Sequence, residues 1–248
     1  MSSQTNKCDA LAALHAAPSA WVIPNPWDVG SALDLERLGF KALATSSSAF
    51  AYTLGLNDGE VTLAEKLAHC EAIANAVQIP VSVDFEDGFS GDPVAVAANI
   101  RSLAATGVAG CSIEDFSRTE QQVFDFNHAV ERIEAAVEAV AGLGLAFQLT
   151  ARAESLLRKH ADLDHAIKRL QAYGKAGAHV LYAPGLTTLA QVKTVAASID
   201  RPLNVLLPFM PEATLADLSA AGATRVSMGG ALQQSARSGF IAAAKALL

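Results

Sequence analysis

The feature that most constrains the fold is an alternation, repeated eight times, of short β-rich runs with helical segments. The runs occupy residues 21–26, 42–48, 81–87, 110–116, 146–154, 179–185, 202–208 and 224–230. Alanine- and leucine-rich segments with helical spacing lie between them, and several end at a glycine, the residue expected just after a helix. Strands that are apolar on both faces and alternate with helices indicate a parallel sheet covered by helices.

Eight strand–helix units in 248 residues predict a (β/α)8 barrel of the TIM type, formed as a single domain by residues 1–248. An open doubly wound sheet is the alternative. It usually carries a glycine-rich phosphate loop after its first strand, where this chain has NPWDVGS (residues 25–31). We also expect an extra helix at residues 5–16, before the barrel.

Composition and charge narrow the classes of function. The formal net charge of −7 argues against a nucleic-acid or anionic-membrane surface. No apolar run reaches membrane-spanning length, and the first residues lack the apolar core of a signal peptide. The 3 cysteines include no CxxC pair, so neither a disulfide framework nor a zinc site is indicated. We therefore expect a soluble cytoplasmic protein.

Polar residues collect where the expected strands end, which is the end that carries the active site in such barrels. Asp84 and Glu86, two apart on a strand, should point the same way. Two carboxylates about 5 Å apart repel by roughly 3 kcal/mol at an effective dielectric constant of about 20, so a cluster takes up protons or recruits a divalent cation. Carboxylates suit Mg²⁺, with Mn²⁺ as the alternative. The strand-end residues are Asn25, Asp28, Ser46, Ser47, Ser48, Asp84, Glu86, Asp87, Glu114, Asp115, Arg152, Glu154 and Asn204, with Asp58 in the loop after the second strand.

Four stretches resemble the isocitrate lyase/phosphoenolpyruvate mutase superfamily: TSSSAFAYTLGLND (45–58), VSVDFEDGFSG (81–91), GCSIEDF (110–116) and LTARAESLL (149–157). The resemblance implies an (α/β)8 barrel in a homo-oligomer, a dimer or tetramer, with the last helix exchanged between subunits. It implies an enzyme that binds a small 2-oxo or 2-hydroxy acid through Mg²⁺. The reaction implied breaks or forms a C–C or P–C bond next to a carbonyl.

The resemblance also assigns the metal site. It makes Asp84 the direct ligand, and Asp58, Glu86 and Glu114 the acids that hold metal-bound waters. Such second-shell carboxylates are useful because Mg²⁺ keeps several of its waters.

The substrate residues follow from the same match. Arg152 is expected to grip the substrate carboxylate and polarise its oxo group, and Asn204 to contact the substrate. Ser46, with the backbone N–H groups of Ser47 and Ser48, is expected to cradle the carboxylate. The expected catalytic residues are Arg152, Ser46 and Glu114.

The loop after the fourth strand departs from the lyases of this superfamily. Isocitrate and methylisocitrate lyases carry KKCGH there, with the cysteine as general acid–base, whereas residues 114–133 of this chain contain no cysteine. A true isocitrate lyase is therefore not expected. Because the loop also lacks clear phosphoryl-handling residues, we expect a lyase that cleaves a C–C bond of a small 2-oxo or 2-hydroxy di- or tricarboxylic acid through an enolate, by a retro-aldol or Claisen reaction or by decarboxylation. A P–C mutase or hydrolase acting on phosphonopyruvate or a carboxyphosphonate is the alternative. A barrel that binds a 2-oxo acid without turnover is the third.

Three charged residues are expected in structural roles or left open. Asp87 points opposite to Asp84 and suits a turn. Glu154 is as suited to supporting Arg152 as to a direct role. Arg169 is expected on a helix surface.

Overall fold

The strands of the computed structural model, which describes residues 3–248, form a nearly closed parallel barrel. Each predicted run contains one barrel strand, so the predicted (β/α)8 architecture is confirmed. The first two residues of the expected single domain lie outside the described residues. The barrel strands are β1 (Trp21–Ile23), β2 (Leu43–Ala44), β3 (Val81–Asp84), β4 (Gly110–Glu114), β7 (Gln148–Arg152), β8 (Val180–Tyr182), β9 (Leu203–Leu206) and β10 (Arg225–Ser227).

The barrel closes between β1 and β2. Along the sheet the strand order is β1-β10-β9-β8-β7-β4-β3-β2, and neighbouring strands are parallel. The N–H of Ala44 in β2 donates to the carbonyl of Pro24, just after β1, at 3.0 Å. The alternative of an open doubly wound sheet is therefore wrong.

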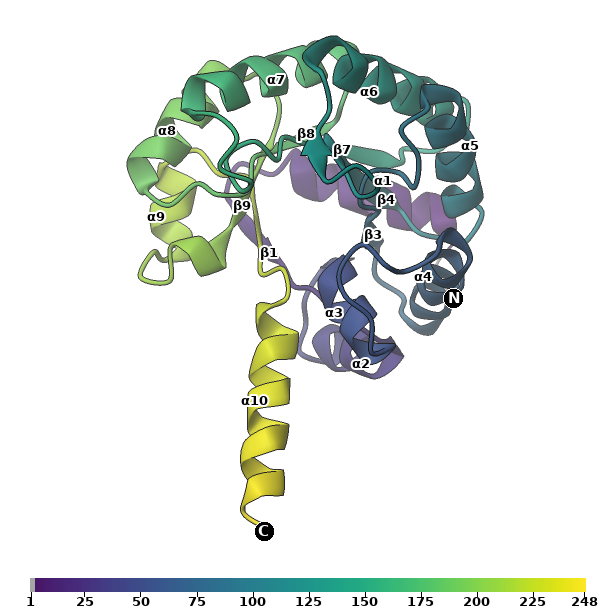
Figure 1. Ribbon diagram of the computed structural model, residues 1–248, viewed down its shortest axis with the longest axis vertical. Helices are drawn as coiled ribbons and strands as arrows, with labels where there is room; N and C mark the ends of the chain where they lie inside the picture. Colours follow the sequence, from purple (N-terminus) through teal and green to yellow (C-terminus); the bar gives the residue numbers. More distant parts are fainter. Residues whose placement is uncertain (1–2) are drawn as a thin grey trace.

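Helices form a ring around the strands (Figure 1). Local sequence sets their ends: Thr62 and Glu65 form a capping box at the start of α4, and Asp92 caps α5. Helix α7 ends at Gly177, whose φ of 107° favours glycine because it has no side chain. The ring and its loops contain α2 (Val29–Arg37), α3 (Ser47–Thr53), α4 (Leu63–Ala76), α5 (Pro93–Ala104), α6 (Phe126–Ala141), α7 (Leu163–Ala176), α8 (Leu189–Ser198), the 3-10 turn η1 (Leu207–Phe209) and α9 (Leu215–Ala220).

The apolar core lies between the helices and the strands. Helix side chains such as Ile73, Ile133 and Leu170 are at most 2% exposed. Burying one side chain of this size contributes about 1.5–3 kcal/mol. The inside of the barrel also carries small polar side chains, including Ser82 and Ser112, which line a cavity. These small residues leave room for a ligand.

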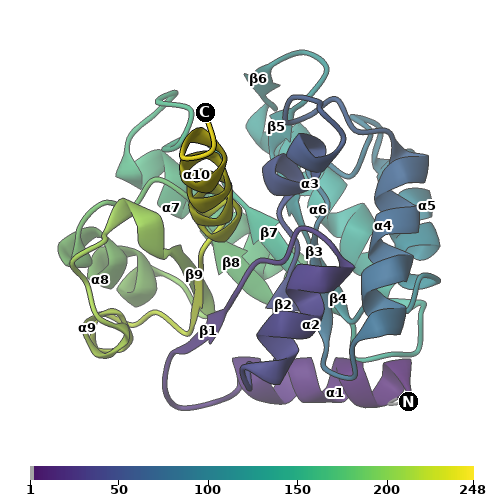
Figure 2. The ribbon, with the colours of Figure 1, turned by 90° about the horizontal axis from the view of Figure 1, so that it is seen from below.

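An extra helix, α1 (Gln4–His15), lies across the end of the barrel opposite α3, as Figure 2 shows, and confirms the helix predicted before the barrel. Lys7 anchors it by donating from Nζ to the carbonyls of Ala74 and Val77, each at 2.7 Å. His15, at its end, reaches Arg225 inside the barrel. Helix α1 therefore covers the amino ends of the strands.

The last helix, α10 (Ala231–Lys245), points away from the barrel (Figure 1). Gln233 is its one buried residue, and Phe240 is 71% exposed. Exchange of this helix between subunits stays a prediction. Among the described residues, no helix has the length and apolar character needed to cross a membrane.

The loop after β4 folds into an antiparallel hairpin that the sequence did not predict. Its strands are β5 (Phe116–Ser117) and β6 (Gln122–Val123). The hairpin lies at the same end of the barrel as α3 (Figure 2). It thereby adds residues beside the carboxyl ends of the strands.

Candidate active site

The polar strand ends surround two cavities at the carboxyl end of the barrel. The larger, of about 220 Å³, extends into the barrel, and the smaller, of about 110 Å³, shares Ser47, Asp58 and Arg152 with it. Every residue predicted to bind metal or substrate lines one of the two. The larger is also lined by Ser46, Ser48, Asp84, Tyr182, Asn204 and Arg225, and the smaller by Glu86, Glu114, Arg118 and Arg158.

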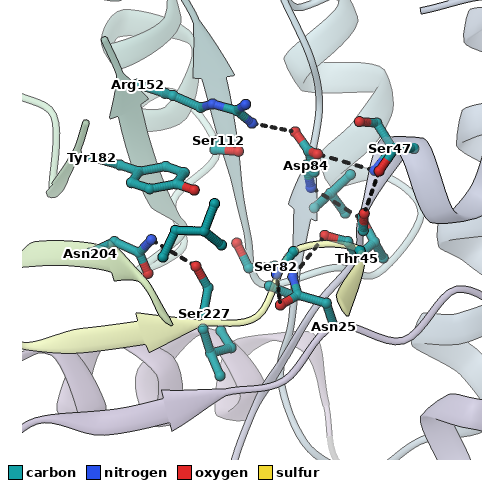
Figure 3. Close-up of a pocket in the computed structure, with 18 of the residues that line it drawn as sticks. Asn25, Thr45, Ser47, Ser82, Asp84, Ser112, Arg152, Tyr182, Asn204 and Ser227 are labelled. Carbon is teal, nitrogen blue, oxygen red and sulfur yellow. Dashed lines mark hydrogen bonds and ion pairs between the residues drawn. The ribbon is translucent and has the colours of Figure 1, made fainter. Parts of the chain in front are cut away.

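Asp84 ends β3 and lies between a backbone donor and a guanidinium (Figure 3). Its Oδ2 accepts from the Ser47 N–H at 3.1 Å, and its Oδ1 lies 3.5 Å from a terminal nitrogen of Arg152. Burial would raise the pKa of Asp84, but Arg152, Lys66 and the Ser47 N–H outweigh it and lower the pKa below its usual range. Asp84 is therefore ionised at neutral pH, as a metal ligand must be.

Glu86 reaches the smaller cavity from outside the strand. Its φ is 51°, and β3 ends at Asp84, so Glu86 is not part of the extended strand. The alternation of side chains along a strand therefore does not set its direction relative to Asp84, contrary to what the sequence had suggested. The buried carboxylate lies 3.5 Å from Lys66 Nζ and 3.3 Å from a nitrogen of Arg118. Burial raises the pKa of Glu86, and these two cations oppose that shift in part.

Arg152 ends β7 and joins three carboxylates. One terminal nitrogen lies 3.5 Å from Asp84 and 3.2 Å from Glu114, while Nε donates to Glu154. Burial lowers the pKa of Arg152, but Glu114, Glu154 and Asp84 raise it well above its usual value. Burial raises the pKa of Glu114 well above its usual range; Arg152 opposes this shift, and Glu154 adds to it. The guanidinium therefore stays charged among acids that compete for it.

Arg158 is a second cation in this network. Its Nε lies 3.0 Å from Glu154 Oε2, and its Nη2 lies 3.8 Å from Glu114 Oε1. Its guanidinium also stacks 3.7 Å from the centroid of Phe116 in the hairpin. Glu154 thus supports both arginines, the structural role left open for it. We call Asp84, Glu86, Glu114, Arg152, Glu154 and Arg158 the mouth.

The serine loop begins α3. Ser46 is the N-cap residue: its Oγ accepts from the Ala49 N–H at 3.4 Å and lies 3.2 Å from Ser48 Oγ. The Ser47 N–H, predicted to hold a substrate carboxylate, holds Asp84 in this structure. Asp58 is exposed in the loop after α3 and lines both cavities.

Two asparagines lie deeper. Asn204 donates to Ser227 Oγ at 2.9 Å, and it lines the larger cavity as predicted for a substrate contact (Figure 3). Asn25 accepts from the N–H groups of Met228 and Gly229 at 2.8 and 2.9 Å. It also donates to the carbonyl of Thr45, so it ties the loops after β1, β2 and β10 together.

Two strand-end acids point away from the cavities, as does Asp28, which caps α2. Asp115 accepts from Tyr173 Oη at 2.6 Å and pairs with Arg169 at 2.9 Å. Arg169 is 3% exposed, so its expected place on a helix surface is wrong. Asp87 accepts from the N–H groups of residues 89 and 118, which fits the turn role predicted for it.

The sequence comparison decides the family. The family model for phosphoenolpyruvate phosphomutase matches residues 11–248. The chain belongs to this family. Its membership, and its place in the wider isocitrate lyase/phosphoenolpyruvate mutase superfamily, confirm the resemblance seen in the four sequence stretches.

Curated relatives support this family assignment. An uncharacterized protein of Mycobacterium tuberculosis H37Rv is 34% identical, over 87% of this chain and 80% of the relative. The 2-methylisocitrate lyase of Escherichia coli K12 is 33% identical, over 69% of this chain and 60% of its own length.

Solved structures of the superfamily share the fold. A presumed lyase/mutase from Burkholderia cenocepacia J2315 is 42% identical with a TM-score of 0.94, over 98% of this chain and 88% of that one. A 2,3-dimethylmalate lyase is 28% identical with a TM-score of 0.89, over 100% of this chain and 88% of that one.

The acids of this family member fit a hard divalent cation. Glu86 Oε1 is buried and lies 3.5 Å from Lys66 Nζ, but among residues 3–248 it has no hydrogen-bond partner, which leaves it an acceptor for a metal-bound water. Within that described range, no group of three or more His, Cys, Asp and Glu side chains could hold a metal directly. The arrangement fits one direct ligand, Asp84, with waters between the cation and the other acids, which Mg²⁺ commonly retains.

Several site residues were missed by the sequence reasoning. Lys66 is fully buried and donates to the carbonyl of Asp84 at 3.2 Å, but nothing in its helical segment marks it. Arg158 could have been found, because it follows Glu154 by four residues, a spacing typical of ion pairs within a helical turn. Tyr182 and Arg225 carry no local signal, since their place depends on the barrel register.

Proposed function

We propose that this chain is a Mg²⁺-dependent lyase that cleaves a carbon–carbon bond of a small 2-oxo or 2-hydroxy di- or tricarboxylic acid through an enolate. The observation that carries the proposal is the ionised Asp84 beside Arg152 at the edge of the larger cavity. A cation at Asp84 and the Arg152 guanidinium would act on the same substrate carboxylate from two sides.

The cleavage of a 2-hydroxy acid has a defined balance. The hydroxyl gives its proton to a base, and its oxygen forms a C=O bond as the adjacent C–C bond breaks. The electron pair of that C–C bond remains on the departing acid as an enolate, which then takes up a proton. A bound Mg²⁺ supplies Lewis-acid stabilisation of negative charge on oxygen. Arg152 would bind the substrate carboxylate and stabilise growing negative charge, in an orientation fixed by Glu114 and Glu154.

Two of the relatives support C–C chemistry. The E. coli relative is a 2-methylisocitrate lyase, and a structural relative is a 2,3-dimethylmalate lyase. Both names describe lyases of substituted carboxylic acids. We infer the same class of reaction here, with a proton donor other than a cysteine of the hairpin, which has none.

One observation favours the phosphonate alternative. Arg118 and Arg158 line the smaller cavity beside Glu86 and Glu114. Additional guanidinium groups next to a metal site suit a phosphonate or phosphoryl group. Phosphonopyruvate or a carboxyphosphonate is therefore the second candidate substrate.

A panel of 2-oxo and 2-hydroxy acids tests the proposal. The purified protein is incubated with each acid in Mg²⁺ or in EDTA, and pyruvate, glyoxylate, carbon dioxide and phosphate are measured. We expect a C–C cleavage product in the samples with Mg²⁺ and none in the samples with EDTA. Phosphate release from phosphonopyruvate without any C–C product would favour the alternative. Tight oxalate binding without turnover would indicate a non-catalytic binding protein.

We also propose that the protein is a homo-oligomer, a dimer or tetramer that exchanges α10. The apolar residues Phe240, Ile241, Leu247 and Leu248 at this end of the chain are 37–108% exposed. A second copy could cover them. Light scattering on the protein as it elutes from a size-exclusion column measures its mass in solution. The mass should be two or four times the chain mass of 25.7 kDa, whereas the mass of a monomer would refute this proposal.

A further inference from the structure

The larger cavity reaches an arginine at the end of the barrel opposite the mouth. Arg225 is the first residue of β10, and it lines the cavity together with Asn204 and Ser227. It is 5% exposed. We call Arg225 and its hydrogen-bond partners, Asn204, Thr150 and His15, the floor.

The partners of Arg225 are neutral. Its Nε donates to Asn204 Oδ1 at 2.7 Å, its Nη2 to Thr150 Oγ1 at 3.1 Å, and its Nη1 lies 3.2 Å from His15 Nε2. Burial and the nearby Arg225 lower the pKa of His15 to about 3, so this imidazole is uncharged at neutral pH. Within residues 3–248, Arg225 forms no ion pair with a carboxylate.

The positive charge of Arg225 therefore has no negative counter-charge among the described residues of the floor. Burial lowers the pKa of Arg225 to about 10, which still leaves it protonated at neutral pH. A buried charge is costly unless it is paired. A guanidinium has five N–H donors, and the three contacts of Arg225 leave two for another acceptor.

A row of register partners leads from the mouth to the floor. Glu114 pairs with Arg152, Arg152 with Tyr182, Tyr182 with Asn204, and Asn204 with Arg225, each on the next parallel strand. Register partners point to the same face, and strand tilt makes such a row descend along a barrel. Arg152, Tyr182 and Asn204 follow one another along one wall (Figure 3). The last four residues of the row line the same cavity, so it connects two guanidinium groups.

We propose that Arg225 binds a second carboxylate of the ligand at the floor, while the first is held beside Arg152 at the mouth. The inference rests on the proposed function for the first carboxylate and adds the residue that binds the second. Asn204 supports the same anion: its Oδ1 is occupied by Arg225, so its amide N–H₂ serves the remaining contacts, one of which is Ser227. Specificity for a dianion over a monoanion then comes from Arg225.

Malate and lactate form a matched pair of probes, because both are 2-hydroxy acids and malate has one more carboxylate. Their affinities are measured by calorimetry in Mg²⁺ on wild type, Arg225→Met, Arg225→Lys and the control Arg101→Met, which replaces an exposed arginine. We expect wild type and the control to prefer malate by about tenfold or more, as a charge-assisted contact provides. Arg225→Met should reduce the preference to about one, and Arg225→Lys should retain part of it.

A malate preference that Arg225→Met leaves unchanged would overturn the inference, as would equal affinity of wild type for both acids. The wild-type ratio and Arg225→Lys decide the question even if the methionine variant does not fold. Lactate binding separates this result from the proposed function. Lactate binding is therefore also measured on wild type in EDTA and on Asp84→Asn. If both bind lactate as wild type does in Mg²⁺, the proposed function fails; if both lose it and wild type in Mg²⁺ shows no malate preference, only the floor inference fails.

Discussion

The mouth and the floor, which the larger cavity connects, hold their buried charges in opposite ways. At the mouth, Arg152 and Arg158 share the carboxylates Glu114 and Glu154, and Asp84 stands beside them. At the floor, the partners of Arg225 within residues 3–248 are neutral. The mouth thus has acids enough to recruit a cation, while the floor has a cation that lacks an anion. The difference indicates a pocket built for a ligand with a metal-bound end and a free anionic end.

The largest effect is expected from removing the arginine that organises the mouth. Arg152→Met leaves Glu114, Glu154 and Asp84 without their shared cation. We expect kcat/KM to fall by about a thousandfold or more, which corresponds to roughly 4 kcal/mol of transition-state stabilisation. The fall in kcat/KM is measured by steady-state kinetics on the substrate found in the acid panel. Arg37→Met is the control, because the Arg37 side chain is 72% exposed. Activity near the wild-type level would remove Arg152 from the mechanism.

A smaller effect is expected behind the mouth, where Asp115 is a structural acid. Asp115→Asn weakens the contacts with Arg169 and Tyr173 and leaves a buried guanidinium without its acid. We expect a loss of about 2–4 kcal/mol of unfolding free energy. Urea denaturation measures it against Asp34→Asn, an exposed acid whose loss should cost less than about 1 kcal/mol. Equal stability of the two variants would show that the acids behind the mouth are not structural.

The smallest effect is expected at the floor and depends on pH. Burial lowers the pKa of His15 from 6.5 to about 3, so between these values the unfolded chain binds a proton that the folded chain does not. The contribution of neutral His15 to the free energy of unfolding is therefore fully present above pH 6.5. As the pH drops toward 3, this contribution is lost by about 1.4 kcal/mol per pH unit. Urea denaturation of His15→Gln at pH 7 and pH 5 should show a smaller loss than wild type. The same pH dependence in both proteins would mean that burial at the floor does not lower the pKa of His15.

The sequence predicted the barrel because its period is repeated eight times, and each repeat supports the others. It placed all the expected metal and substrate residues on the two cavities, since barrel topology alone brings strand ends together. The direction of single side chains was less predictable. Glu86 leaves the strand through a positive φ, and Arg169 turns inward to meet Asp115, neither of which a repeat pattern reports.

The floor was missed for a different reason. Arg225 and Asn204 are 21 residues apart, and His15 lies in a helix 210 residues before Arg225. Only the register of β9 and β10 and the position of α1 across the barrel bring them together. Local spacing carries no information about such contacts.

The most direct test of the contrast between mouth and floor is a calorimetric titration of Mg²⁺ into wild type, Asp84→Asn and Arg225→Met, each with oxalate present. We expect one bound Mg²⁺ per chain in wild type, loss of that binding in Asp84→Asn, and its retention in Arg225→Met. Mg²⁺ binding that survives in Asp84→Asn with wild-type affinity would contradict this expectation.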